Sequence, residues 1–147
     1  MKPLIEIGMT HWYHLKGQRS LPFRNDLDPI NIAKLLGHSC LIRVINDGED
    51  FEYKIIGSGI QAISRSGQTG KKISEIESQK KPSDIYDLFS TVVRAKIPQF
   101  KTIKYIGTDV RVQSVEVAVF PFTSKDAGGN VTDLWSIVEA NSYRPED

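Results

Sequence analysis

The stretch SCLIRVINDGEDFEYKIIG, residues 39–57, decides the fold class of this chain. Two runs rich in β-branched and aromatic residues, 39–46 and 51–57, flank a polar cluster that contains the pair Asp47-Gly48. Runs of this kind on either side of an Asp-Gly turn are typical of a β-hairpin. We therefore expect two antiparallel strands here.

The residues after the hairpin change from strand to helix character. Four glycines within residues 57–77 favour short helical pieces, which we expect at 59–64 and 73–77. A longer helix is predicted from about residue 83 to residue 97, because Ser83 is a good N-cap and its apolar residues recur with helical spacing. The chain therefore crosses from the hairpin to its last third through helices.

Three more strands are expected at 99–106, 110–122 and 133–140. Hairpin links at both ends of the chain imply one antiparallel sheet of five strands. The strand at 110–122 is apolar on both sides, with valines on one face and Phe120 and Phe122 on the other, so both sheet faces need a cover. We expect the crossover helices to cover one face, and the N-terminal helix or a second subunit to cover the other.

The N-terminal region predicts a helix over residues 9–16. Its apolar face, at the spacing i, i+3, i+4, i+7, consists of Met9, Trp12, Tyr13 and the stem of Lys16. His11 and His14 lie on the opposite side, and because no further metal ligand stands at matching spacing we interpret them as a solvated polar face.

A second helix is expected to begin at Asp28-Pro29, an N-cap followed by proline at the first helical position, and to stop at Gly37. The chain then divides into an N-terminal helix and connection (1–28), a main domain (29–141) and a C-terminal tail (142–147).

Composition excludes several classes of protein. A formal net charge of +1 over 147 residues argues against a nucleic-acid partner held by a strong positive field. The one cysteine, Cys40, excludes an intrachain disulfide and a thiolate zinc cluster, and we expect it to be buried and structural. The sequence has no stretch of about 18 apolar residues and no signal-peptide core. We expect a cytoplasmic protein with no metal and no membrane partner.

Several ordered segments resemble one family. They are GQRSLPFRNDLDP (17–29), FEYKIIGSGI (51–60), GQTGKKI (67–73) and VFPF (119–122). Together with the element order they resemble a PAS domain, and more specifically the small stand-alone PAS-like family common in alphaproteobacteria. The resemblance implies an α+β fold of the order β-β-α-α-α-β-β-β with N-terminal helices. It also implies a small sensing or interaction module, often without a bound cofactor.

A sheet that curls against short helices often leaves a pocket. The residues that we expect around such a cavity are Tyr53, Ser58, Gln61, Phe89, Tyr105 and Trp135. The alternative is that these side chains simply fill the core. Glu116 lies among valines, and strand alternation places it on the outer face.

The leading hypothesis is a non-enzymatic PAS-like protein that signals through contacts with other proteins. We expect no resident cofactor, and an unknown small ligand in the cavity is possible under this hypothesis. Because no output segment is attached, the signal would pass to another, unknown chain. We expect a homodimer whose interface includes Met9, Trp12 and Tyr13. The alternatives are a dedicated small-molecule sensor and a small α+β enzyme of the cone-shaped type, in which helices precede the sheet.

Overall fold

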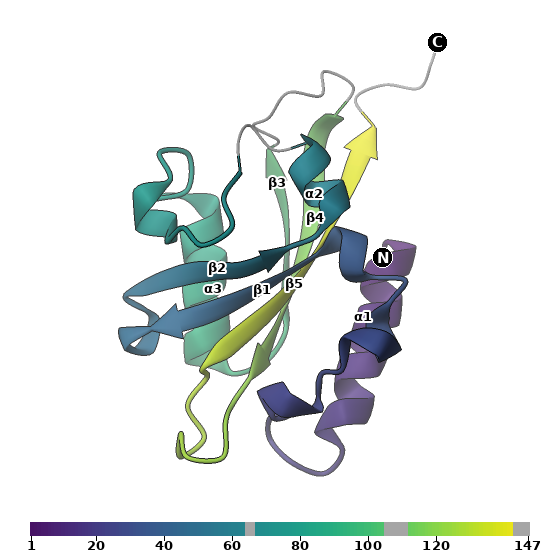
Figure 1. Ribbon diagram of the computed structural model, residues 1–147, viewed down its shortest axis with the longest axis vertical. Helices are drawn as coiled ribbons and strands as arrows, with labels where there is room; N and C mark the ends of the chain where they lie inside the picture. Colours follow the sequence, from purple (N-terminus) through teal and green to yellow (C-terminus); the bar gives the residue numbers. More distant parts are fainter. Residues whose placement is uncertain (64–66, 105–111, 143–147) are drawn as a thin grey trace.

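The computed structural model describes residues 1–63, 67–104 and 112–142. Five strands form one antiparallel sheet in the spatial order β2-β1-β5-β4-β3 (Figure 1). The strands are β1 (Ser39–Ile45), β2 (Asp50–Ile56), β3 (Gln99–Lys104), β4 (Val112–Phe122) and β5 (Asp133–Ser142). The α-helices are α1 (Pro3–Lys16), α2 (Ser58–Ile63) and α3 (Asp84–Ala95). The expected α+β fold with a five-stranded antiparallel sheet is confirmed.

The predicted hairpin is formed by β1 and β2. Val44 pairs with Phe51 and Ile45 with Asp50, so the turn spans Asn46 to Glu49. Asn46, Asp47 and Gly48 all have positive φ angles, of 48°, 58° and 108°. Asn, Asp and Gly are the residues that adopt this left-handed region at low cost, which is why this cluster ends β1 and begins β2.

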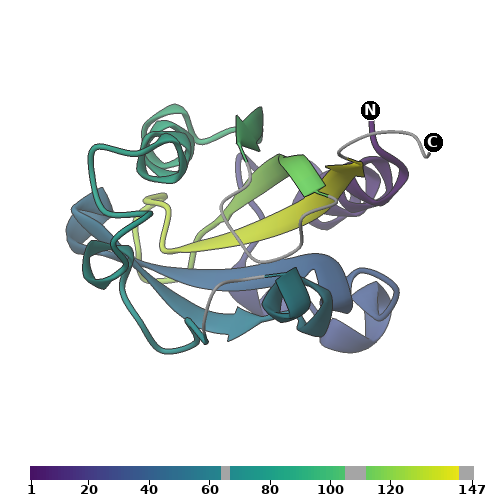
Figure 2. The ribbon, with the colours of Figure 1, turned by 90° about the horizontal axis from the view of Figure 1, so that it is seen from above.

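Strand β5 joins the β1–β2 hairpin to the β3–β4 pair at the middle of the sheet. This strand pairs with β1 on one side and with β4 on the other. The sheet is strongly twisted, so that its edge strands β2 and β3 run in clearly different directions (Figures 1 and 2). Helices α2 and α3 follow β2 and precede β3, whereas the cone-shaped enzyme fold has its helices ahead of the sheet.

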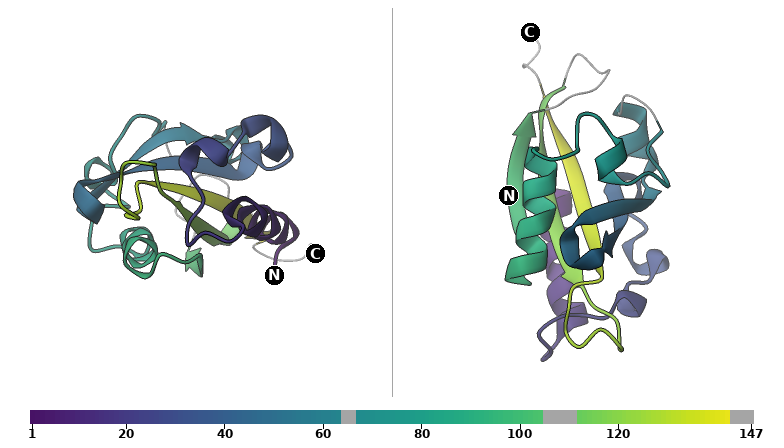
Figure 3. Two further views of the ribbon diagram at one scale, coloured as in Figure 1. Left: turned by 90° about the horizontal axis from the view of Figure 1, so that it is seen from below. Right: turned by 90° about the vertical axis from the view of Figure 1, so that its left-hand side faces the viewer.

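The sheet is covered on both faces, as its apolar pattern requires. In the right-hand view of Figure 3, α3 lies in front of the sheet and α1 lies behind it. Leu88, Phe89 and Val92 are the buried residues of α3. Ser83 caps this helix by accepting a hydrogen bond from the Tyr86 amide at 3.0 Å. None of the helices in the described ranges has the length and apolar character that crossing a bilayer requires.

Helix α1 covers the outer face within the same chain. Its buried residues are Ile5, Gly8 and Trp12. The Trp12 ring packs against Phe120 with ring centres 6.4 Å apart, and its indole N–H donates to the Pro121 carbonyl at 2.9 Å.

The expected helix at 9–16 therefore begins too late, and its expected apolar face is only partly right. Trp12 is buried and Met9 is half-buried, but Tyr13 is 54% exposed. The reason is that the helix begins at Pro3, so that Ile5 and the small Gly8 become its line of contact with the sheet. Trp12 lies inside the chain, which corrects its assignment to an interface between subunits.

The expected second helix is wrong. Asp28 does cap a turn, because its carboxylate accepts from the Ile30 amide at 2.9 Å. The chain then forms two separate 3-10 turns, Pro29–Ile32 and Leu36–His38. The carbonyls of Ile32 and Leu35 accept from amides three residues ahead. Each turn closes hydrogen bonds of the 3-10 type and stops after three or four residues, so Ile32 and Leu35 are buried without a continuous helix.

The contact between Gly8 and Ile137 gives a stability prediction. A Cβ at position 8 would overlap Cδ1 of the buried Ile137. We expect Gly8→Ala to lower the free energy of unfolding by about 1 kcal/mol, because an overpacking cost of about 1–3 kcal/mol exceeds a helix-propensity gain of about 1 kcal/mol. In an Ile137→Val background, which lacks Cδ1, Gly8→Ala should become neutral or stabilising. Urea denaturation of the four proteins measures this.

Thr10→Ala is the matched control, since Thr10 is exposed on the same helix. It should change stability by no more than about 0.7 kcal/mol, the range of helix propensity, and by the same amount in both backgrounds. Equal effects of Gly8→Ala in both backgrounds would contradict the proposed contact.

Candidate functional site

A cavity of about 510 Å³ lies between the inner face of the sheet, α3 and the segment that precedes α3. Its apolar walls come from β2, α2, α3 and the three C-terminal strands. These residues are Ile56, Ile60, Ile85, Phe89, Ile103, Val115, Val117 and Val138. Pockets of this size and lining are typical of small-molecule sites. The cavity is therefore the candidate functional site.

A chain of hydrogen bonds forms the first polar group of the cavity. The Tyr53 hydroxyl donates to Oε1 of Gln79 at 2.6 Å, and Nε2 of Gln79 donates to Oε1 of Gln68 at 3.2 Å. The loop that carries Gln68 is tied to β2, because the Gly70 amide donates to the Tyr53 carbonyl at 2.7 Å and the Tyr53 amide donates to the Lys71 carbonyl. We call Tyr53, Gln79 and Gln68 the amide relay.

Cys40 and Ser136 form the second polar group. They are opposite each other in the β1–β5 pair and both line the cavity. Burial raises the pKa of the Cys40 thiol to about 12, although hydrogen bonds with Ser136 and Gly57 lower it in part. Burial, and next the neighbouring Cys40, raise the pKa of the Tyr53 phenol above its ordinary value. Both groups are therefore neutral at physiological pH.

The structure supports two of the six expected cavity residues. Tyr53 and Phe89 line the cavity. Ser58 and Gln61 are exposed and lie outside its lining; the Gln61 amide instead donates to the Ile56 carbonyl at 2.9 Å. Tyr105 lies outside the described residues.

Trp135 lies on the opposite face of the sheet, so its assignment to the cavity is wrong. Its ring packs against Phe120 at 5.3 Å beneath α1. Its indole N–H donates to the Ser39 hydroxyl at 2.9 Å, and that hydroxyl donates to the Leu35 carbonyl at 2.7 Å. Trp135 precedes Ser136 by one residue in β5, and only alternate residues of a strand share a face.

The cavity residues that sequence reasoning missed are of two kinds. Ser136 and Cys40 occupy strand positions, and the alternation of Leu134, Ser136 and Val138 could have placed Ser136 on the inner face. Cys40 is buried, as expected. Gln68 and Gln79 lie in irregular segments without periodicity, and no sequence pattern marks them.

The outer face of the sheet holds Glu116, as predicted. Its carboxylate accepts from Asn141 at 3.0 Å and from the Thr102 hydroxyl at 2.9 Å. These two hydrogen bonds, in that order, lower the pKa of the Glu116 carboxyl. Glu116 therefore stays charged and away from the cavity.

His11 differs from the expected solvated face. Its ring meets Trp135 edge-on at 6.3 Å, and its Nε2 atom is buried without a hydrogen-bond partner in the described part of the chain. Burial, and second the nearby His14, lower the pKa of His11. His14 itself is exposed. The orientation of α1 about its axis therefore places His11 against the sheet and leaves His14 in solvent.

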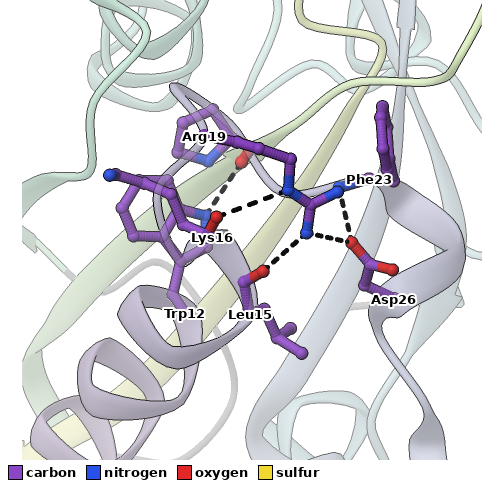
Figure 4. Close-up of polar contacts among 7 residues, drawn as sticks. Trp12, Leu15, Lys16, Arg19, Phe23 and Asp26 are labelled. Atoms are coloured by element: carbon purple, nitrogen blue, oxygen red, sulfur yellow. Dashed lines mark hydrogen bonds and ion pairs between the residues drawn. The ribbon is translucent and has the colours of Figure 1, made fainter.

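The segment 17–29 holds the end of α1 in place (Figure 4). The Arg19 guanidinium donates to the Leu15 carbonyl at 2.8 Å and to the Asp26 carboxylate at 2.9 Å, and it lies 4.6 Å above the Phe23 ring. A cation at the last carbonyls of a helix is favourable. This arrangement explains a structural use for the arginine, phenylalanine and aspartate of GQRSLPFRND.

Comparison with known proteins gives a family and a fold. A family model described as a PAS domain matches residues 3–134. A crystal structure of a sensory box sensor histidine kinase from Vibrio cholerae has a TM-score of 0.52 and 16% identity, covering 78% of this chain and 92% of that chain. The PAS domain of histidine kinase ThkA has a TM-score of 0.45 and 12% identity, covering 69% of this chain and 97% of that chain. No curated protein matches.

The environment of Cys40 predicts slow chemistry. With a pKa near 12, against an ordinary value of 9.0, Cys40 holds roughly a thousandfold less thiolate in mildly alkaline buffer than an unperturbed cysteine. We expect iodoacetamide to alkylate the native chain at least about a hundredfold more slowly than the guanidinium-unfolded chain, because thiolate is the reacting form. Mass spectrometry of timed samples measures both rates, and equal rates would contradict the buried position.

Proposed function

The chain belongs to the PAS domain family, and we propose on that premise that it is a sensory module whose inner cavity binds a small molecule. The observation that carries this proposal is the cavity of about 510 Å³ behind α3. The polar groups of its inner part, which are the amides of Gln68 and Gln79, the Tyr53 phenol, the Ser136 hydroxyl and the Cys40 thiol, are suited to hydrogen bonding. These inner groups are neutral near physiological pH, which favours binding over proton-transfer catalysis.

We further propose that the output passes by contact with another protein chain in the cytoplasm. The likeness to a sensor histidine kinase from Vibrio cholerae, at 16% identity, concerns the fold. A free buried thiol, Cys40, is compatible with a reducing compartment. The proposed module would thus convert cavity occupancy into a change of surface that a partner reads.

Cavity filling tests the ligand-binding role. Val138 is half-buried and lines the cavity, so Val138→Phe should occupy part of its space. Native mass spectrometry of the purified chain should reveal a retained small molecule, or a thermal-shift screen of metabolites should find a stabiliser, since a ligand at about 100 times its Kd adds about 2.7 kcal/mol. Val138→Phe should abolish both the retention of the small molecule and the ligand-induced thermal shift.

Ile55→Phe is the matched control. Ile55 is 50% exposed and does not line the cavity, so this variant should behave as the parent chain. The proposal fails if the parent retains nothing and responds to no compound, or if Val138→Phe responds as strongly as the parent.

A second copy of this chain is the partner that the outer face of the sheet and α1 support best. Ring contacts run from Tyr13 to Trp12 at 5.0 Å, from Trp12 to Phe120 at 6.4 Å, and from Phe120 to Phe100 at 6.3 Å. The two end members, Tyr13 and Phe100, are 54% and 45% exposed. Exposed aromatic side chains beside a packed core are common at interfaces. We propose that a second copy covers Tyr13, Phe100 and the half-buried Met9.

Truncation of the two aromatic residues tests the dimer. Tyr13→Ser and Phe100→Ser should each weaken self-association roughly tenfold, because interface aromatics commonly contribute more than about 1 kcal/mol. Sedimentation equilibrium over a concentration series measures this. Ile30→Ser is the control, since Ile30 is 81% exposed in a 3-10 turn and takes no part in these ring contacts. A parent chain that is monomeric throughout would contradict the proposal.

A further inference from the structure

The polar groups of the cavity restrict the charge of its ligand. The amide relay of Tyr53, Gln79 and Gln68 and the pair of Cys40 and Ser136 face the same space. Glutamine and serine side chains carry no charge, and burial keeps the thiol and the phenol protonated. The inner surface therefore offers hydrogen bonds without a formal charge.

The charged residues of the lining, Asp84 and Lys104, lie in exposed positions. Asp84 also has a partner, because Nζ of Lys101 lies 3.3 Å from its carboxylate. A carboxylate or an ammonium group held at the inner polar groups would lose its hydration without gaining an opposite charge, which is strongly unfavourable. The interior of the cavity therefore disfavours a ligand group that carries a charge.

The direction of the amide relay shows which ligand group would be recognised. The Tyr53 hydroxyl already donates to Gln79, and one N–H of Gln79 already donates to Gln68. Each amide nitrogen has two N–H groups. Among the described contacts, the second N–H of Gln79 and both N–H groups of Gln68 have no recorded acceptor. The relay therefore has three N–H donors left to offer, and a carbonyl oxygen of a ligand is an acceptor that suits them.

The remaining walls favour an apolar body. Tyr53 and Phe89 meet edge to face at 6.5 Å, and Val117 and Val138 belong to the sheet floor. We propose that the cavity binds an uncharged, largely apolar molecule with a carbonyl group, whose oxygen accepts hydrogen bonds from Gln79 and Gln68. This inference rests on the proposed sensory function and adds the chemical class of its ligand.

Three probes with one ring system test the class. They are 2-acetylnaphthalene, which is neutral with a carbonyl, 2-ethylnaphthalene, which is neutral without an acceptor, and 2-naphthoate, which is an anion. Each is titrated into the full chain and followed by amide correlation NMR, including the side-chain amide signals of Gln68 and Gln79. The ketone should bind roughly three- to tenfold more tightly than the ethyl compound, because only the ketone can accept a hydrogen bond from the amide relay. The anion should bind most weakly.

Variants locate the residues that donate to the carbonyl oxygen of the ligand. Gln79→Leu should reduce ketone affinity to the level of the ethyl compound and leave the latter unchanged, and Gln68→Leu provides the same test where Gln79→Leu does not fold. Gln18→Leu is the matched control, because Gln18 is exposed after α1. Equal binding of the ketone and the ethyl compound, or tighter binding of 2-naphthoate, overturns the ligand class alone. If none of the probes shifts the cavity signals, the ligand class fails, and the cavity-based function then stands or falls with native mass spectrometry and the metabolite screen of the parent chain.

Discussion

The central constraint on this molecule is that strand β4 is apolar on both faces. Val117 and Val119 face inward, Phe120 and Phe122 face outward, and all four are buried. Neither face of the sheet can be left in water without a large loss of hydrophobic stabilisation. The chain must therefore supply two covers, and it does so with α1 on one side and α3 on the other.

The two covers differ in how tightly they pack against the sheet. On the outer face, the glycine at position 8 lets α1 approach Ile137, and the Trp12 and Trp135 indoles both have hydrogen-bond acceptors. On the inner face, α3 and the segment before it leave a cavity of about 510 Å³. The tightly packed face stabilises the fold, while the loosely packed face has room for the proposed ligand.

The sequence predicted the elements well where local chemistry decides them. The Asp47-Gly48 turn, the Ser83 cap and the alternation in β4 each act over a few residues, and each was predicted correctly. It failed where long-range packing decides. The role of Gly8 depends on Ile137, which is distant in the chain. Trp135 is a different case, because the alternation along β5 could have placed it on the outer face and its aromatic character alone was used instead. Gln79 enters the cavity from an irregular segment, where no periodicity exists to be read.

The position of β5 at the middle of the sheet has a consequence for synthesis of the chain. The β1–β2 hairpin and the β3–β4 pair are complete before β5 is translated, yet β5 joins them. Helix α1, which precedes the sheet in the chain, packs against β4 and β5 and so has no complete docking surface until β5 is made. During synthesis the apolar surfaces of α1 and β4 would stay uncovered until β5 emerges, and a chaperone would be most useful in that interval.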